Sequence, residues 1–330
     1  MKTVFLFVIW TAWPAGAAEH RVVAERYWHT FSAAHPVLLR VKPGDHIATK
    51  TVDSAGFDLT GVRRTATHGN PLTGPFFVEG AEPGDALEVR IARIRLNRAT
   101  GYTGYQVGLK NTPSVEKPGA DIVYKGYDYL FPWAIELKRG VVRTGRLEFA
   151  AQPMLGCIGV APEKDYSPRS GPAGYWGGNL DYNLIREGAT VLLPVFHRGG
   201  LLFFGDGHAL QGDGEAVGSG VETSLDVEVT VGLRKRQKLT RPRVETAEWI
   251  VSVGGKEDGT LNETLEIATR DMLRWLIDEH GLSAQEAHLL IGMRARYDLI
   301  TLGGSVGLRI ARRDFLRIKQ KTGPLVEGKR

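Results

Sequence analysis

The segment GAEPGDALEVRIARI, residues 80–94, contains the pattern that decides the fold. In its Pro-Gly-Asp tripeptide, proline presets the backbone of a tight turn and glycine takes the position that requires a positive φ. After the turn, apolar and polar residues alternate, as they do in a half-buried strand. The segment therefore predicts a turn that leads into a strand, with Asp85 bonded to the turn backbone.

Two further segments repeat this pattern. The same tripeptide occurs between strand patterns in RVKPGDHIATKTV, residues 40–52, and a related unit is REGATVLLPVF, residues 186–196. The chain has 41 glycines, which indicates many turns, and no useful helical period precedes residue 260. We therefore predict a mainly β protein with a β-sandwich core built from repeated strand pairs, and we expect Asp45 to act as Asp85 does.

The pattern changes after TRPRVET, residues 240–246, which we interpret as a linker. In residues 261–281 apolar side chains recur at spacings of three and four, which predicts a helix. Ser283 and Glu286 form the capping-box pair of a second helix, and residues 298–311 predict a strand hairpin. The expected divisions of the chain are a signal peptide at 1–18, a β-sandwich catalytic region at 19–240 and a small α+β lobe at 241–330.

The first eighteen residues have the order of an export signal. Lys2 supplies a positive start, VFLFVIWTAW supplies a short apolar stretch, and AGAA supplies the small residues of a cleavage site. The apolar stretch is shorter than the roughly 20 residues of a membrane span. We expect cleavage after Ala17 or Ala18 and export to the periplasm or the medium, with no stable membrane association afterwards. An uncleaved anchor is the alternative.

Charge and cysteine content exclude other classes of protein. The formal net charge of the 330 residues is +5 at pH 7, which is too mild to indicate a nucleic-acid partner. The single cysteine, Cys157, excludes a disulfide scaffold. Its neighbours in the sequence provide neither a base nor a cation, so a buried structural thiol is favoured over a reactive one.

The densest polar segment is FGDGHALQGDGE, residues 204–215. Asp206 and His208 lie two residues apart, as do Asp213 and Glu215, and residues two apart in extended backbone point to the same side. Each pair could therefore hold one ion or one substrate. Imidazole and carboxylate are suitable zinc ligands. The alternative is a glycine-rich loop whose aspartates form turns.

Two other segments offer candidate site residues. In GYWGGNLDYN, residues 174–183, Asn179 and Asp181 are again two apart and follow a pair of glycines. Asp53 stands at the end of a predicted strand in TVDSAGFD. A plain turn into a strand is the alternative for the first of these segments.

Four motifs, in this order, resemble the acetamidase/formamidase family: NPLTGPFFVEGAEPGDALEV (70–89), MLGCIGVAP (154–162), GGNLDYN (177–183) and GDGHALQGDGE (205–215). The resemblance implies a jelly-roll-like β-sandwich with smaller lobes. It also implies hydrolysis of the C–N bond of small linear amides, such as acetamide or formamide, to ammonia and a carboxylate. Some members are associated with divalent metal, zinc or calcium. The positions that match are Asp53, Asn179, Asp181, Asp206, His208, Gln211, Asp213 and Glu215.

Chemistry suggests a role for each of these positions. The predicted metal ligands are Asp181, Asp206, His208 and Asp53, and the histidine favours zinc over calcium. Glu215, with Asp213 beside it, is the predicted general base and acid, and Asn179 and Gln211 are predicted to orient the substrate amide. The rival hypothesis is an exported calcium-binding β-sandwich that binds sugar or peptide without catalysis. Two further possibilities stay open: the protein could be an inactive member of the family, and it could form a homo-oligomer.

Overall fold

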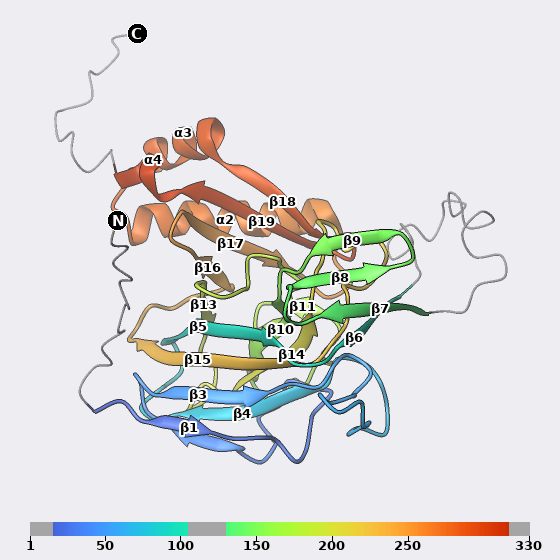
Figure 1. Cartoon of the computed structure of the whole chain (residues 1–330). Helices are drawn as coiled ribbons and strands as arrows, with labels where there is room; N and C mark the ends of the chain where they lie inside the picture. Colours follow the sequence, from blue (N-terminus) through green and yellow to red (C-terminus); the bar gives the residue numbers. More distant parts are fainter. Residues whose placement is uncertain (1–15, 105–129, 317–330) are drawn as a thin grey trace, which may run out of the picture.

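A computed structural model describes residues 16–104 and 130–316 of the chain (Figure 1). The predicted signal peptide, residues 1–18, lies outside the described residues except for its last three. The described strands form three sheets. None of the helices in this part of the chain is both long and apolar enough to cross a membrane.

The largest sheet has nine strands and runs through most of the molecule. Its strands, in spatial order, are β1 (Glu19–Arg21), β3 (His46–Lys50), β15 (Leu225–Arg234), β5 (Ala86–Leu96), β13 (Thr190–Pro194), β16 (Arg243–Glu245), β17 (Trp249–Gly255), β19 (Ser305–Ala311) and β18 (Arg296–Thr301).

A six-stranded sheet faces it, and a four-stranded sheet lies at one side (Figure 1). The six strands, in order, are β11 (Ala173–Gly174), β12 (Gly177–Asn179), β10 (Met154–Val160), β14 (Leu202–His208), β4 (Leu72–Val78) and β2 (Leu39–Val41). The four are β6 (Thr100–Gly104), β7 (Leu130–Glu136), β8 (Val141–Thr144) and β9 (Leu147–Ala150).

The main hydrophobic core lies between the nine-stranded and six-stranded sheets. It combines residues such as Ile91 and Val229 from one sheet with Ile158 and Phe204 from the other, all with no exposed surface. The ring of Phe76 stacks on that of Phe204, with centroids 5.3 Å apart. Burial of these apolar surfaces is the main favourable contribution to folding. The prediction of a mainly β protein with a sandwich core is confirmed.

The Pro-Gly-Asp turns form as predicted. Gly44 and Gly84 have φ values of 99° and 91°, the left-handed region that suits glycine. The carboxylate of Asp45 accepts a hydrogen bond of 2.8 Å from the backbone N–H of Lys42. Asp85 accepts the equivalent bond, 2.9 Å long, from the N–H three residues before it.

Both of the longer C-terminal helices begin at capping boxes, and the one at Ser283 and Glu286 was predicted. Helix α2 (Leu261–Asp278) has a complete capping box at Thr260, and helix α3 (Ala284–Arg294) has one at Ser283. A short helix, α4 (Arg312–Leu316), follows β19. The buried face of α2 includes Trp275, which packs into the core, whereas Leu265 is 40% exposed.

The predicted linker at 240–246 is instead part of the sheet. Strand β16 pairs with β13 on one side and with β17 on the other. The nine-stranded sheet therefore continues through residue 240, and α2 packs on its strands β17 and β19. The small C-terminal helical lobe is built onto one end of the main sheet, and this brings it close to the residues described below.

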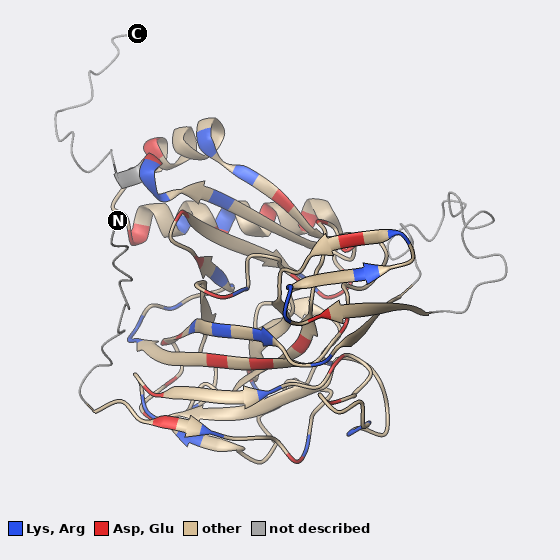
Figure 2. Ribbon diagram, in the orientation of Figure 1, with Lys and Arg blue, Asp and Glu red and all other residues tan. Residues whose placement is uncertain are grey.

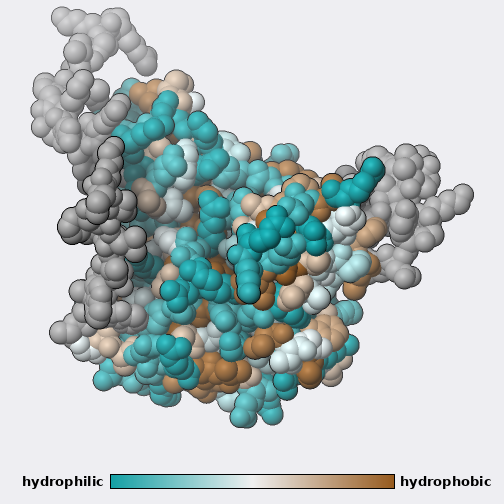
Figure 3. All heavy atoms as spheres, viewed as in Figure 1, coloured by the Kyte–Doolittle hydropathy of each residue, from teal (hydrophilic) through white to brown (hydrophobic). Residues whose placement is uncertain are grey.

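The surface is mixed in charge and hydropathy. Figure 2 shows basic and acidic residues interspersed along the strands, and Arg93 of β5 lies 3.4 Å from Glu228 of β15 as one example. The face in Figure 3 likewise mixes hydrophilic and hydrophobic residues. This distribution agrees with the mild net charge of the chain.

Candidate active site

An imidazole and three carboxylates meet at the end of strand β14. The Nε2 atom of His208 lies 3.1 Å from Glu222 Oε1, 3.6 Å from Asp206 Oδ1 and 4.0 Å from Asp181 Oδ1. None of these four residues is more than 2% exposed. The structure therefore brings together Asp181, Asp206 and His208, as the spacing of the motifs predicted, and adds Glu222.

The sheet places these groups in the protein interior. Strand β14 pairs with β10 on one side and β4 on the other, and all seven of its residues are buried. Asp206 and His208 both belong to this strand. Asp181 follows β12, which pairs with the other edge of β10. The charged side chains are therefore buried because their strands lie in the middle of the sandwich.

Gly156 of β10 leaves the space that the two aspartates occupy. A Cβ atom at this position would lie 2.7 Å from Asp181 Oδ1 and 2.7 Å from Asp206 Oδ2. The backbone C=O of Gly156 also accepts a 3.0 Å hydrogen bond from the N–H of Asp181. Only glycine allows the two carboxylates to approach the strand so closely.

Three acidic site residues have left-handed backbone. The φ values of Asp181, Asp206 and Glu215 are 51°, 56° and 45°. Few residues other than glycine adopt this region, and those that do cluster at functional sites. The surrounding sheet therefore holds these three side chains in directions that an ordinary strand would not give them.

Glu215 approaches the cluster from the following loop. Ligand-type atoms of Glu215, Glu222 and His208 all lie within 4.8 Å of one another. The C-terminal lobe fixes this loop, because the N–H of Gly214 donates to Leu299 O at 2.8 Å and the N–H of Leu302 donates to Gly214 O at 2.8 Å. Strand β18 and its turn thus help to position Glu215.

Gln211 sets the orientation of the imidazole. Its Nε2 donates to the backbone C=O of Asp181 at 2.6 Å, so its Oε1 is the atom that faces His208 Nδ1, at 2.7 Å. Nδ1 must then carry a hydrogen in order to donate to that oxygen. The other ring nitrogen, Nε2, faces the carboxylates. A neutral ring would point its lone pair at three acids, an arrangement that a proton or a metal cation between them would stabilise.

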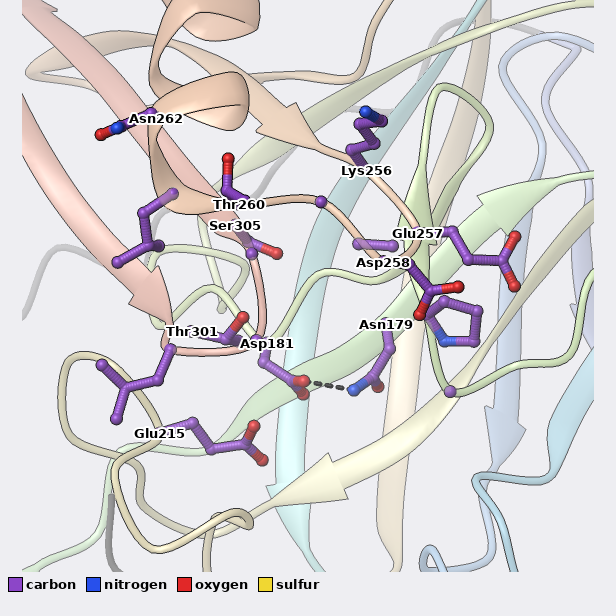
Figure 4. A pocket seen from close by; sticks show the side chains of 18 residues that line it. Asn179, Asp181, Glu215, Lys256, Glu257, Asp258, Thr260, Asn262, Thr301 and Ser305 are labelled. Carbon is purple, nitrogen blue, oxygen red and sulfur yellow. Dashed lines mark hydrogen bonds between the residues drawn. The ribbon is translucent and has the colours of Figure 1, made fainter. Parts of the chain in front are cut away.

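Asn179 is held by neighbours on both sides of its amide. Its Nδ2 donates to Asp181 Oδ2 (Figure 4). Its Oδ1 accepts from Asn70 Nδ2 at 3.0 Å and from the thiol of Cys157 at 2.8 Å. Asn70 Nδ2 also donates to Asp206 Oδ2 at 3.0 Å. In this structure Asn179 and Gln211, both predicted to orient substrate, hold Asp181 and His208 in position.

The protonation of the cluster follows from burial and mutual charge. Burial raises the pKa of Glu222 to about 8, and His208 opposes this rise. Burial acts to lower the pKa of His208, but the charges of Glu222 and Asp206 raise it well above its ordinary value. Burial acts to raise the pKa of Asp206, but His208 holds it below its ordinary value. The acids therefore favour a positive charge at the position of His208 Nε2.

The donor set fits a divalent metal. The buried oxygens Asp206 Oδ1 and Glu222 Oε2 accept no hydrogen bond from any described residue, and buried oxygens of this kind are costly unless a donor or a cation satisfies them. Carboxylates and a neutral imidazole are ligands that zinc takes. The contact from Gln211 is the kind of partner that fixes a metal-binding histidine.

Two of the predicted site residues lie outside this cluster. The carboxylate of Asp53 forms an ion pair of 2.5 Å with Arg98 Nη2, and its Oδ1 accepts from the N–H groups of Ala55 and Phe57. Asp53 is fully buried, but its oxygens are occupied by these structural contacts. Asp213 is exposed and accepts a 2.8 Å hydrogen bond from Asn183.

Glu222 and Asn70 were not among the predicted site residues. Glu222 stands in GSGVETSLDV without a second carboxylate or histidine two residues away. It reaches the site through a single antiparallel bridge with His208, which joins positions that no local pattern connects. Asn70 begins the family-like segment NPLTGP, and that segment was the one available signal for it.

A pocket of about 890 Å³ opens onto the cluster (Figure 4). Asn179, Asp181 and Glu215 line one part of it. The C-terminal lobe supplies another part, through the loop of residues 256–262 and the turn of residues 301–305. Asp181 and Glu215 are therefore accessible to a molecule bound in this pocket.

Known proteins resemble this chain in sequence and in structure. A model of the acetamidase/formamidase family matches residues 16–171 and 166–297. The chain is 26% identical to the acetamidase of Mycolicibacterium smegmatis, in a match that covers 83% of this chain and 86% of that protein. It is 26% identical to the formamidase of Methylophilus methylotrophus, in a match that covers 61% of this chain and 62% of that protein. The chain thus spans less than two thirds of that formamidase.

The fold agrees with the sequence comparison. The crystal structure of a predicted acetamidase/formamidase from the thermophile Thermoanaerobacter tengcongensis superposes with a TM-score of 0.78. The two sequences are 29% identical, and the match covers 92% of this chain and 99% of that one. The resemblance seen in the four sequence motifs is confirmed, and the chain belongs to the acetamidase/formamidase family.

Proposed function

We propose that the protein hydrolyses the C–N bond of linear amides, and that it releases ammonia and a carboxylate. The observation that carries this proposal is the buried cluster of His208 with Asp181, Asp206 and Glu222 beside a large pocket. Membership of the acetamidase/formamidase family supports it. The rival hypothesis of a calcium-binding module without catalysis gains no support from that membership.

The proposed metal is zinc, held by Asp181, Asp206 and His208. When bound, a divalent ion supplies Lewis-acid chemistry, because it polarises a carbonyl group and makes water more acidic. Glu222 lies 3.1 Å from His208 Nε2 and adds a further carboxylate to the set. Gln211 keeps His208 Nε2 directed toward the acids, and Asn179 keeps Asp181 in place.

Glu215 is the proposed proton carrier. It lines the pocket and is 8% exposed, so its carboxylate lies where a substrate would bind but is largely screened from solvent. An amide has a poor leaving group, and its nitrogen must gain a proton before the C–N bond breaks. Glu215 takes a proton from the attacking water and delivers it to that nitrogen. Asp213 is exposed and outside the residues that line the pocket, so Glu215 carries this role in the proposal.

Export remains part of the proposal and rests on residues 1–18 alone.

The test of function uses purified protein and a panel of formamide, acetamide and propionamide. We expect ammonia release that stops when a chelator strips the protein and returns when zinc is added. Bound zinc should be near one equivalent per chain before stripping. Absence of ammonia release from every amide, with zinc bound, would refute the proposed function.

A further inference from the structure

The pocket is much larger than acetamide requires. Its volume of about 890 Å³ lies in the range of roughly 300–1,000 Å³ that accommodates drug-sized ligands. Acetamide carries only a methyl group on its carbonyl carbon. With its amide at Asp181 and Glu215, most of the pocket beside the C-terminal lobe would stay unfilled.

The wall supplied by the C-terminal lobe is well defined. Gly304 has φ +103°, and a Cβ atom there would lie 2.6 Å from Gly259 O, so the turn and the loop are in close contact. The loop leads directly into α2 through the capping box of Thr260 and Glu263. The turn is fixed to the other side of the pocket, because Thr301 forms a parallel bridge with Gly214 next to Glu215.

This wall presents acidic groups to the pocket. Lys256, Glu257 and Asp258 all line it, but the Lys256 ammonium is neutralised by an ion pair with Glu263. Figure 4 shows Lys256 extending away from Asn179 and Asp181, and Asp258 on the side of Asn179. Glu257 accepts a hydrogen bond from the hydroxyl of Tyr166. Asp258 forms no ion pair within the part of the chain described.

We propose that the pocket selects linear amides whose acyl chain extends toward the C-terminal lobe and ends in a cationic amine, with Asp258 as the main specificity-determining residue. This inference rests on the proposed amide hydrolysis. The amide end of such a substrate lies at Asp181 and Glu215, and the ammonium end lies at Asp258 and Glu257. A carboxylate at the same end would meet acids of like charge.

Three amides of equal acyl length test the inference. They are 5-aminopentanamide, pentanamide and glutaramate, whose far ends are cationic, neutral and anionic, and acetamide is the reference. We expect kcat/KM to fall in that order. Each step should be about two- to fivefold, which is the size of one partly exposed charge interaction. The advantage of 5-aminopentanamide should shrink in high salt, because salt screens such interactions.

Two matched variants test whether Asp258 causes the preference for the cationic amide. Asp258→Asn should lower kcat/KM for 5-aminopentanamide by about two- to fivefold and leave kcat/KM for acetamide unchanged. Glu266→Gln removes the same charge from an exposed position of α2 outside the pocket lining, and it should change neither rate.

The outcomes separate this inference from the function on which it rests. The protein could hydrolyse acetamide but act on 5-aminopentanamide no faster than on pentanamide. That result would overturn the inference and leave amide hydrolysis standing. An unchanged preference in Asp258→Asn would remove that residue from the specificity assignment. If none of the amides, acetamide included, releases ammonia, the proposed function fails and the inference fails with it.

Discussion

Gln211 Oε1 lies 2.7 Å from His208 Nδ1, and this contact determines which ring nitrogen faces the acidic cluster. The amide cannot turn over without loss of its second bond, from Nε2 to the C=O of Asp181. The side chain therefore links the imidazole to the backbone of one of its own acidic partners. The glutamine three residues after the histidine thus fixes the orientation of the imidazole.

Replacement of this glutamine should weaken metal binding. Gln211→Ala removes the acceptor that keeps hydrogen on Nδ1, so we expect zinc affinity to fall by about 10- to 100-fold. Competition with a chromogenic chelator measures this directly. Gln285→Ala, on exposed helix α3, is the matched control. Equal zinc affinity in both variants would show that Gln211 does not orient the ligand.

Gly156→Ala should damage the site more than the fold. The new methyl group would meet Asp181 Oδ1 and Asp206 Oδ2, each at 2.7 Å, and would push the carboxylates apart. We expect loss of bound metal and of ammonia release, while the far-UV circular dichroism stays mainly β. Gly292→Ala is the control, because nothing lies within 4 Å of that position in α3. A Gly156→Ala protein with full metal content would contradict the described packing.

A substitution at Arg98 tests whether Asp53 stabilises the fold or binds metal. Arg98→Ala leaves the fully buried Asp53 carboxylate without its ion-pair partner, a change that typically costs about 3–5 kcal/mol. Denaturant unfolding should show a loss of this size. Zinc bound per folded chain should be unchanged, since Asp53 belongs to neither group of metal-compatible side chains. Loss of zinc at unchanged stability would instead restore Asp53 as a ligand.

Glu245 of strand β16 should make the stability of the fold depend on pH in the acid range. Burial acts to raise the pKa of Glu245, but hydrogen bonds and charges from Arg234 and Arg312 hold it below its ordinary value. A lowered folded-state pKa stabilises the protein above the unfolded value, near 4.3, and that stabilisation is lost as the pH falls through the folded pKa. Glu245→Gln should therefore be less stable than wild type at pH 7. The difference should shrink steadily below pH 4.

Denaturant titrations at pH 7 and at pH 3.5 measure that difference, with Glu266→Gln as an exposed control. A constant difference at both pH values would mean that the ionised form of Glu245 contributes nothing to stability.

Local features were predictable from the sequence, and non-local ones were not. The turns at Gly44 and Gly84 and the cap at Ser283 depend on a few adjacent residues, and the structure has them. The strand within residues 240–246 depends on pairing with β13, far away in the sequence, so its Arg-Pro-Arg composition suggested a linker.

The same distinction applies to the site. Asp206 and His208 share one strand, so their spacing alone predicted that the two side chains lie together. Asp53 has the same chemistry, but Arg98 lies 45 residues away and neutralises it. Glu222 joins the cluster only through the bridge to His208. The type of each side chain identified it as a candidate site residue, but the residue that it contacts depended on the tertiary structure.

The most direct test of the account measures ammonia release and zinc content on the same samples of wild type and Glu215→Gln. Glutamine keeps the size of the side chain but cannot accept a proton near neutral pH. The account predicts that the variant retains its zinc and loses about 10²–10⁴-fold in rate, as expected for a lost general acid and base. Ammonia release at the wild-type rate, with zinc retained, would contradict the assignment of the proton transfer to Glu215.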